Sequence, residues 1–230
     1  MSYTPPLPDC PLCPRLVTFR QENRAQHPHF YNAPVPSFGG FDAEFLVVGL
    51  APGLKGANRT GRPFTGDYAG LVLYSALEKS GFAAGKYDPE KVAAKAKGNG
   101  AHYDHGADGF HLKNCRITNG VRCVPQQNKP EPSEIRQCNM FLKKEIAAMP
   151  NLKVILSLGL VSHKAVLMAL GFKQSAFAFS HGGEHHITGV KPLTFLNSYH
   201  CSRYNINTGA LTQAMFDKVV ERVRIHLDLK

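Results

Sequence analysis

The stretch GANRTGRPFTG, residues 56–66, has the glycine spacing of a phosphate-binding loop but lacks its other residues. Gly56 and Gly61 occupy the two glycine positions of GxxxxG, after which a P-loop continues with Lys and then Ser or Thr. Here Arg62 and Pro63 follow instead. Because proline has no backbone N–H to donate and the metal-binding hydroxyl is missing, this stretch does not form a nucleoside triphosphate cradle.

Four of the six cysteines could form a metal site. Cys10 and Cys13 form a CxxC pair near the N-terminus, and Cys123 and Cys138 form a second, wider pair. A CxxC turn brings two sulfurs to one metal, and two more thiolates from distant sequence would complete the set. The wide second pair does not match a zinc ribbon, which closes with another CxxC. The spacing fits zinc and an iron–sulfur cluster about equally, and four buried thiols are the alternative. Cys115 lies in an apolar run and is expected in the core.

Strands and helices must bring such residues together, and the apolar pattern predicts both. Short apolar runs predict four buried strands, at residues 44–50, 115–121, 153–159 and 192–197. Helical periodicity with start and stop signals predicts helices at residues 67–80, 133–149, 162–170 and 212–227. Strands that alternate with helices predict an α/β fold in which helices cover both faces of a mostly parallel, four-stranded sheet.

Ligands of such folds bind beyond the carboxyl ends of the strands. Four features are predicted to meet there: the loop from Gly49, the Asn119 turn, the Gly159 turn and the segment NSYHCS at residues 197–202.

Two polar segments interrupt the alternation of strands and helices. Residues 83–114 contain glycines and lysines and are expected to form an inserted surface loop with at most one helix. The segment HGGEHH, which begins at His181, resembles a metal site but lacks the HExxH spacing of a zinc hydrolase. A turn that joins two segments is the better interpretation.

Length and charge narrow the class of protein. The 230 residues suit one α/β domain or a domain with a small appendage. The net charge of +10 makes nucleic acid the first partner to consider, and a solvated basic surface is the alternative. The N-terminal MSYTPPLPDC has no apolar core, so no secretory signal is expected, and the longest apolar stretch, KVILSLGLVS, is too short to span a bilayer. We therefore expect a cytoplasmic protein with no membrane partner and no disulfide framework.

Three longer segments follow CPLCPRL in order along nearly the whole chain: VVGLAPGLKGANRTGRPFTGDYAG, ITNGVRCVPQQNKPEPSEIRQC and NSYHCSRYNINTG. Together they resemble the uracil-DNA glycosylase superfamily, most closely its fifth, b-type group. The resemblance implies a single domain over residues 1–230, a monomer built as a three-layer α/β/α sandwich. It also implies a four-iron, four-sulfur (4Fe-4S) cluster with Cys10, Cys13, Cys123 and Cys138 as ligands, which favours iron–sulfur over zinc.

The resemblance implies a DNA repair enzyme that excises uracil, with hypoxanthine and other deaminated bases as further candidates. Such an enzyme swings the base out of the stack and hydrolyses the bond between base and sugar, which leaves an abasic site. The barrier falls if the departing base is stabilised as an anion and the sugar cation is stabilised from its other face. Gly49, Leu50, Ala51, Pro52 and Gly53 would turn sharply at a strand end, so that backbone N–H groups approach the base and sugar.

Five further residues are candidates for contacts to the base or to the DNA around it. Phe64 would stack on the flipped ring, a contact worth roughly 1–3 kcal/mol on other aromatic platforms, and a core phenylalanine is the alternative. The amide of Asn119 can meet both O4 and N3–H of uracil, and a turn-forming asparagine is the alternative. His200 would donate to O2 of the leaving base, for which a neutral imidazole suffices. Arg203 or Tyr204 would wedge into the gap left by the flipped base.

Asp67 is the candidate carboxylate. An aspartate at a helix start needs no purpose beyond capping, but a carboxylate there could also position water and offset the sugar cation. Other groups of the superfamily have an acid or amide at the position of Ala51, so Asp67 is the obvious remaining carboxylate. A second departure follows His200, where Cys201 and Ser202 replace the usual Pro and Ser. The loss of the preset φ of proline puts the rigidity of this loop in doubt.

Two other classes of function compete with the glycosylase. One is a non-catalytic iron–sulfur protein that binds nucleic acid, and the presence of Asp67, Asn119 and His200 together argues against it. The other is an iron–sulfur redox carrier, for which the chain offers no second cofactor signal.

Overall fold

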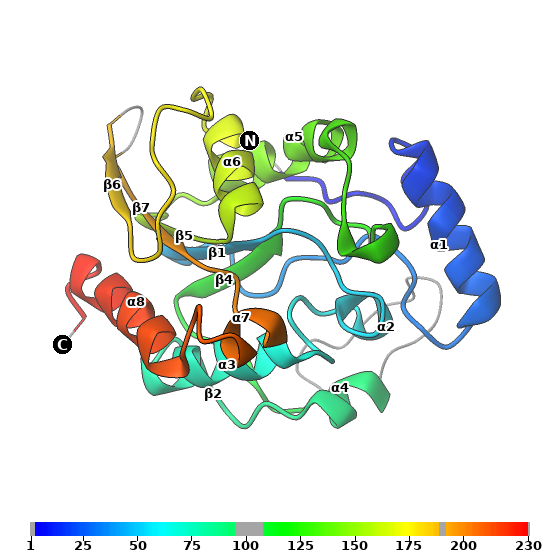
Figure 1. The fold of residues 1–230 in the computed structure, drawn as a ribbon, viewed down its shortest axis with the longest axis horizontal. Helices are drawn as coiled ribbons and strands as arrows, with labels where there is room; N and C mark the ends of the chain where they lie inside the picture. The colour runs from blue at the N-terminus through cyan, green and yellow to red at the C-terminus, as the bar shows by residue number, and fades with distance from the viewer. Residues whose placement is uncertain (1–2, 95–107, 189–191, 230) are drawn as a thin grey trace.

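The central sheet of the protein has five strands. The computed structural model describes residues 3–94, 108–188 and 192–229. The strands lie in the order β4 (Cys115–Asn119), β1 (Phe45–Gly49), β5 (Val154–Leu158), β7 (Leu193–Ser198) and β6 (Glu184–Ile187). The first four are parallel to their neighbours, and β6 pairs with β7 in the antiparallel direction. The predicted α/β fold with a mostly parallel sheet is therefore confirmed (Figure 1).

The predicted count of four strands is wrong, because β6 extends the sheet at its edge. The interpretation of HGGEHH as a turn holds only for its first part, where Gly182 has a φ of +70°. Glu184 and the two residues after it are polar and at least partly exposed, and only Ile187 at the end of β6 is buried. An edge strand of this kind has no apolar run, so the hydrophobic pattern gives no signal for it.

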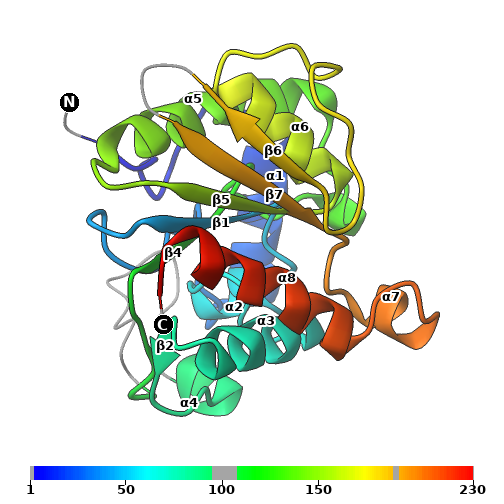
Figure 2. The ribbon, with the colours of Figure 1, turned by 90° about the vertical axis from the view of Figure 1, so that its left-hand side faces the viewer.

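Helices cover both faces of the sheet, as predicted (Figure 1 and Figure 2). One face carries α3 (Tyr68–Lys79) and α8 (Gln213–His226), and the other carries α5 (Pro132–Ala148) and α6 (Leu160–Ala169). Side chains alternate between the two cores along β1: Phe45 and Val47 pack toward α3 and α8, whereas Leu46 and Val48 pack toward α5 and α6. The three-layer sandwich follows directly from this alternation.

The four predicted helices begin and end close to the expected residues. Asp67 is the N-cap of α3 and not its first residue. The helix α6 begins at Leu160, ahead of the predicted Ser162, directly after Gly159, whose φ of +98° suits glycine. None of the helices in the described ranges is long and apolar enough to cross a bilayer.

Several short elements lie in the connections. They are α2 (Ala57–Thr60), α4 (Pro89–Ala94), α7 (Arg203–Asn207), the 3-10 helix η2 (Gln126–Asn128) and a small ladder of β2 (Ala83–Ala84) with β3 (His111–Leu112). Within residues 83–114, the described part contains one helix, but the expectation of a surface loop is wrong there, because β2 and β3 pair and Val92 and Phe110 are buried. Residues 95–107 lie outside the described residues.

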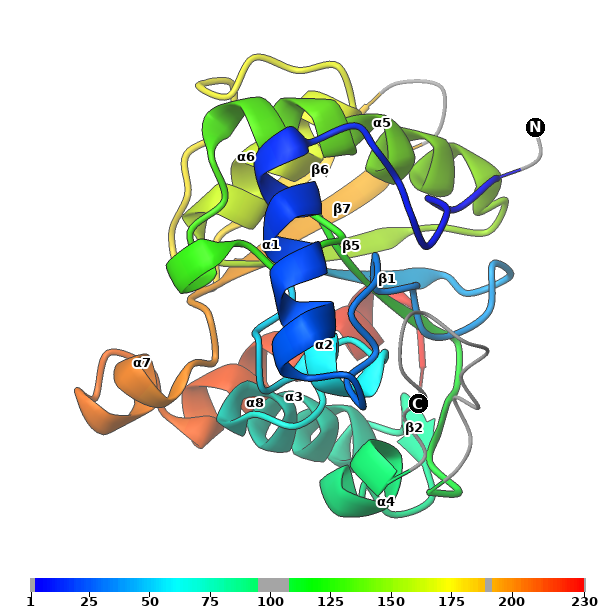
Figure 3. The same cartoon turned by 90° about the vertical axis from the view of Figure 1, so that its right-hand side faces the viewer.

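The longest of the described helices without a counterpart in the sequence prediction lies near the N-terminus. The helix α1 (Pro14–Gln26) begins immediately after the CPLC segment, with Pro14 at a position that proline favours. Figure 3 shows α1 crossing from the layer of α5 and α6 to α2. Polar contacts hold it at both ends: Arg15 forms an ion pair with Glu134 of α5 at 2.6 Å, and Arg24 donates to the carbonyl of Asn32. Because few of its residues are apolar and buried, the sequence shows no helical hydrophobic pattern here.

Candidate active site

A cavity of about 460 Å³ lies beyond the carboxyl ends of the parallel strands. Its volume is within the range of ~300–1,000 Å³ that is usual for small-ligand pockets. The residues of its walls come from five places: Leu50, Ala51, Pro52 and Gly53 after β1, Phe64 and Asp67 before α3, Asn119 at the end of β4, Gly159 to Ser162 after β5, and His200 after β7. The structure thus brings together every predicted base-binding residue except Gly49, which lies behind the wall.

Gly49 leaves room for the two side chains in front of it. A Cβ atom on Gly49 would lie 2.4 Å from Oδ1 of Asn119 and 2.6 Å from Cζ of Phe64. Gly49 is paired with Asn119 between β1 and β4, so the amide and the phenyl ring reach the same place. Phe64 is 7% exposed and packs in the core beneath α3 while it lines the cavity. The core interpretation and the stacking interpretation of Phe64 are therefore compatible.

Asp67 caps a helix and also faces the cavity. Its Oδ1 accepts a hydrogen bond of 3.2 Å from the backbone N–H of Gly70 in the first turn of α3. Its Oδ2 lies beside two glycines, because Cβ atoms on Gly56 and Gly53 would lie 2.6 and 3.5 Å from that oxygen. One carboxylate oxygen thus serves the cap, and the second is presented to the loop after β1.

The surroundings of Asp67 also shift its protonation. The residue is exposed to the cavity, yet protein atoms crowd its carboxylate. Burial raises the pKa of Asp67, and hydrogen bonds from the backbone N–H groups of Gly70 and Ala69 oppose that rise. A carboxylate held away from bulk water interacts more strongly with a nearby positive charge.

His200 lies opposite, in the loop after β7. Its ring centroid is 6.2 Å from that of Phe64. Burial lowers the pKa of His200, which keeps the imidazole neutral at neutral pH. A neutral imidazole can still donate one hydrogen bond to a leaving group.

Hydrogen bonds hold the His200 loop although the usual proline is missing. The side chain of Asn205 donates to the His200 carbonyl at 2.8 Å, and the buried thiol of Cys201 donates to the carbonyl of Ala69 at 3.4 Å. Ser202 caps α7 by accepting from the N–H of Asn205 at 3.3 Å. These contacts replace part of the constraint that proline would supply.

Arg203 and Tyr204 begin α7 at the rim of the cavity. Tyr204 is 75% exposed, and the guanidinium carbon of Arg203 lies 5.4 Å from the centroid of the Tyr68 ring. Arg203 also lines a second hollow that adjoins Asp67 and His200. Both predicted DNA-contacting side chains are therefore exposed next to the cavity.

Asn128 lines the cavity without having been predicted. It ends η2 with a φ of +57°, and Gln127 before it has a φ of +53°. Two successive residues in this region are uncommon outside glycine and suggest a backbone that its neighbours hold in place. Gln126 accepts a hydrogen bond of 2.5 Å from Arg15 of α1. The asparagine in CVPQQNKP was the only available signal, and it indicates a turn as readily as a site.

The four predicted metal ligands come together in a second place. Cys10, Cys13, Cys123 and Cys138 line one small cavity between α1, α5 and the loop after β4. Arg20 of α1 adds contacts there, because Nη1 donates to Sγ of Cys123 at 3.8 Å and Nη2 donates to the Cys10 carbonyl at 3.1 Å.

The chemistry of this cavity fits a thiolate-bound cluster. Burial raises the pKa of Cys13 to about 11 and that of Cys123 to about 12, and the neighbouring thiols of Cys138 and Cys10 add to both shifts. Four thiolates at this place therefore need a positive centre among them. Among the described residues, no group of three or more His, Cys, Asp or Glu side chains has the arrangement that would hold a single metal ion. A 4Fe-4S cluster would take these four cysteines as its thiolate ligands.

The other two cysteines lie elsewhere. Cys115 is 1% exposed and packs in the core under α3, as predicted, and Cys201 is buried beside Ala69.

Fold and cavity together define the class of this protein. The sequence model of the family described as the uracil DNA glycosylase superfamily matches residues 36–224, so the chain belongs to this superfamily. Within it, the chain is similar to proteins of one type. A type-5 uracil-DNA glycosylase of Thermus thermophilus is 39% identical over 224 residues, which cover 95% of this chain and 94% of that protein.

Two further relatives have the same description. A type-5 uracil-DNA glycosylase of Pyrobaculum aerophilum is 34% identical over 220 residues, which cover 94% of this chain and 88% of that protein. One of Mycobacterium tuberculosis is 34% identical over 225 residues, which cover 94% of this chain and 77% of that protein. These matches include the N-terminal part of the chain that precedes residue 36.

Proposed function

We propose that this protein removes uracil from DNA by hydrolysing the N-glycosidic bond, which leaves an abasic site. The observation that carries the proposal is the convergence of Asp67, Asn119, His200 and Phe64 on one cavity at the ends of the parallel strands. The relatives named above, which match nearly the whole chain, are described as uracil-DNA glycosylases.

Recognition of the base rests on Phe64 and Asn119. The base leaves the duplex and enters the cavity, where the phenyl ring of Phe64 offers a stacking surface. The Asn119 amide is nine-tenths buried and presents a donor and an acceptor to the O4 and N3–H edge of uracil. Cytosine reverses that edge, so it would leave buried polar groups unpaired and be rejected.

Bond cleavage rests on charge stabilisation at the two ends of the breaking bond. As the bond between N1 and the sugar lengthens, negative charge moves onto O2 of the base, and a neutral His200 donates a hydrogen bond to it. The sugar becomes positive, and the ionised carboxylate of Asp67 offsets that charge and orients the attacking water. Water supplies the hydroxyl group of the product sugar, and its proton is passed to the surroundings.

The cysteine cavity would hold a 4Fe-4S cluster through Cys10, Cys13, Cys123 and Cys138. Because these cysteines lie at the start of α1, in the loop after β4 and in α5, a cluster bound to them would link these elements, and we assign it a structural and not a redox role. The thiol set, its burial and its mutual repulsion support this assignment.

DNA would lie across the mouth of the cavity. The net charge of +10 favours binding to phosphates, and one of Arg203 and Tyr204 would occupy the space left by the flipped base. We propose that the protein acts as a monomer in the cytoplasm. Ala51, which is small, leaves space that would also admit hypoxanthine or another deaminated base.

A time course of base excision tests the proposed activity. The purified protein is incubated with matched oligonucleotides that contain uracil, hypoxanthine, xanthine or a thymine mispair, and abasic sites are cleaved and counted. We expect uracil to be released, and Asn119→Ala to weaken both base recognition and cleavage. DNA binding without release of any base would contradict the proposal and favour the non-catalytic alternative.

A further inference from the structure

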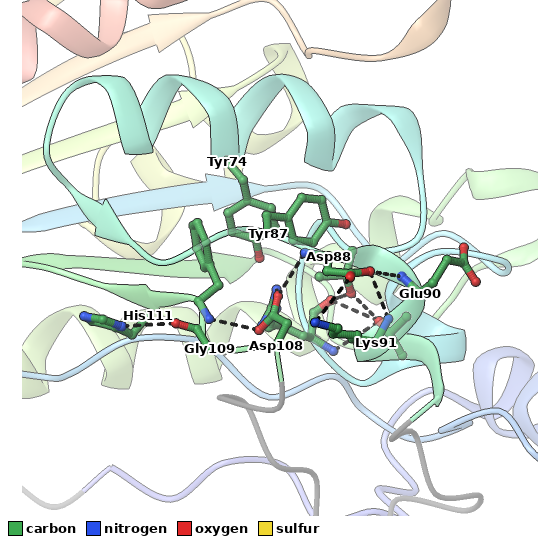
Figure 4. A network of polar contacts seen from close by, with 12 residues as sticks. Tyr74, Tyr87, Asp88, Glu90, Lys91, Asp108, Gly109 and His111 are labelled. Atoms are coloured by element: carbon green, nitrogen blue, oxygen red, sulfur yellow. Dashed lines mark hydrogen bonds and ion pairs between the residues drawn. The ribbon is translucent and has the colours of Figure 1, made fainter.

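The strongest unassigned feature is a polar network outside the cavity, in which Tyr87 and Asp108 contact the loop 62–67. Figure 4 shows the part of the network around Tyr87, Asp88 and Asp108. We propose that Tyr87 and Asp108 are positioning residues that hold the 62–67 loop so that Phe64 and Asp67 face the base. The proposal rests on the proposed catalytic role of Asp67.

The network begins with an ion pair that is completely shielded from water. Arg62 donates to both carboxylate oxygens of Asp108, at 2.9 and 2.8 Å, and both side chains are 0% exposed. The guanidinium faces four aromatic rings, whose centroids lie 4.9–5.6 Å from its central carbon: Phe38, Tyr74, Tyr87 and Phe110. A buried pair with two parallel hydrogen bonds has one favoured geometry, so it fixes the position of Arg62 at the start of the loop.

Asp108 is itself fixed by the backbone of the 83–112 segment. The backbone N–H of Asp88 donates to Oδ2 and that of Phe110 donates to Oδ1, each at 3.2 Å (Figure 4). Asp88 in turn accepts from the N–H groups of Glu90 and Lys91 at the start of α4. The carboxylate of Asp108 therefore joins Asp88, Phe110 and the loop 62–67 in one place.

Two tyrosine hydroxyls hold the loop further along the chain. Tyr74 donates to the carbonyl of Pro63 at 2.5 Å, and the Tyr87 hydroxyl accepts from the N–H of Gly66 at 3.2 Å. Burial raises the pKa of Tyr87 to about 12, so its hydroxyl stays neutral. The contacts thus lie on either side of Phe64 and directly before Asp67.

The loop needs external support because its backbone is strained. Phe64 has a φ of +55°, which bulky residues rarely adopt, and Gly66 has a φ of +80°. A Cβ on Gly66 would lie 2.9 Å from the carbonyl oxygen of Lys55. Such a conformation persists when surrounding contacts fix it. Tyr87 and Asp108 are not among the residues that line the cavity, so they would affect the reaction through the position of the loop. A misplacement of a catalytic group by about 1 Å is enough to slow an enzyme by about a hundredfold.

The first test is Tyr87→Phe, which removes one hydroxyl and keeps the ring beside Arg62. We expect single-turnover uracil excision to slow by about tenfold, while affinity for DNA with an uncleavable uracil analogue changes by less than about twofold. Tyr31→Phe is the matched control, because it removes a hydroxyl from another buried tyrosine, whose ring packs beside Gly61. Equal rates for wild type and Tyr87→Phe would overturn the proposal.

A double-mutant cycle separates positioning of Asp67 from a general loss of structure. In the Asp67→Asn background, Tyr87→Phe should cost clearly less than the loss of about tenfold expected in the wild type, because the carboxylate is gone and only the positioning of Phe64 remains to be lost. Independent, multiplying losses would overturn the link between Tyr87 and Asp67. A fully active Asp67→Asn enzyme would instead remove the proposed role of Asp67.

Hydrogen exchange tests, without any activity measurement, whether the Tyr87 hydroxyl holds residues 62–67 in place. In Tyr87→Phe, peptides that cover residues 62–67 should exchange at least about threefold faster, whereas peptides from β5 should keep wild-type rates. Asp108→Asn should have the same effect more strongly, provided that it folds. Unchanged exchange of residues 62–67 in Tyr87→Phe would show that the hydroxyl does not hold the loop.

Discussion

The loops that carry Asp67 and His200 face each other across one cavity, but they are held in different ways. On the Asp67 side, the buried Arg62–Asp108 pair and two tyrosine hydroxyls fix the backbone. On the His200 side, an amide, a thiol and one helix cap hold a loop that leads into the exposed helix α7. We infer that the Asp67 loop, residues 62–67, is held rigidly, and that the His200 loop, which leads to the exposed residues Arg203 and Tyr204, is held less rigidly.

The proposed cluster at the cysteine cavity would be a third support, and breaking it should have the largest effect. Cys123→Ala should lower both the soluble yield and the yellow-brown colour, with its broad absorption near ~400 nm, because a cluster would lose one of its four thiolates. Cys115→Ala is the control, since Cys115 lies in the core away from this cavity. Absorption spectra and iron and zinc analysis of the purified proteins provide the measurement. A colourless wild type with stoichiometric zinc would contradict the cluster.

Removal of the His200 imidazole tests the proposed role of the His200 loop in the reaction. His200→Ala should slow single-turnover excision of uracil by about a hundredfold, the scale of a lost hydrogen-bond donor to a developing anion. Bases whose anions are less dependent on a donor at O2 should lose less. Binding to an uncleavable analogue, measured beside the rate, should change little. If His200→Ala cleaves uracil at the wild-type rate, the donor must lie elsewhere.

Protonation of either Asp67 or His200 should slow the reaction, so both groups contribute to a loss of rate at acid pH. Burial raises the pKa of Asp67 above its ordinary value of 3.8 and lowers that of His200 below 6.5. Catalysis requires the ionised carboxylate and the neutral imidazole, so both requirements fail as the pH falls. The excision rate should therefore fall as the pH falls, with Asp67 becoming protonated at a pKa above 3.8 and His200 at a pKa below 6.5, and each group should contribute up to about tenfold per pH unit below its own pKa.

A pH profile of the Asp67→Asn variant distinguishes the two contributions. The acid limb should become shallower, because only His200 still titrates. An unchanged limb would mean that the ionisation of Asp67 has no part in the rate.

The smallest expected effect concerns the missing proline. Cys201→Ala removes the thiol that bonds to the Ala69 carbonyl and should slow excision by about threefold, less than Tyr87→Phe. Single-turnover rates of the two variants under the same conditions give the comparison. A larger loss for Cys201→Ala than for Tyr87→Phe would contradict the inference that the Asp67 loop is held more rigidly than the His200 loop.

Much of this fold could be predicted because the relevant signals are local. The apolar runs identify the four parallel strands, and Asp67 with the periodicity after it places α3 within a residue. The edge strand β6 is polar, and α1 is held by arginine contacts and not by an apolar face, so neither has a hydrophobic signature.

The cavity itself was predictable to a similar extent. The segments at the ends of strands were placed together because parallel strands bring their carboxyl ends to one edge, and the resemblance to the superfamily singled out Phe64, Asp67, Asn119 and His200. Asn128 and the Arg62–Asp108 pair were not predicted, because their placement depends on contacts between distant parts of the chain, such as the pair that spans 46 positions. A single sequence contains no local pattern for such a contact.

The rate of Asp67→Asn tests the central claim most directly. Asparagine caps a helix about as well as aspartate, so the variant should fold normally and bind an uncleavable uracil analogue in DNA with nearly unchanged affinity. If the charge of Asp67 supports the sugar cation or orients water, single-turnover excision of uracil should slow by roughly a hundredfold. An Asp67→Asn enzyme that cleaves at full speed would contradict the account and leave Asp67 as a helix cap alone.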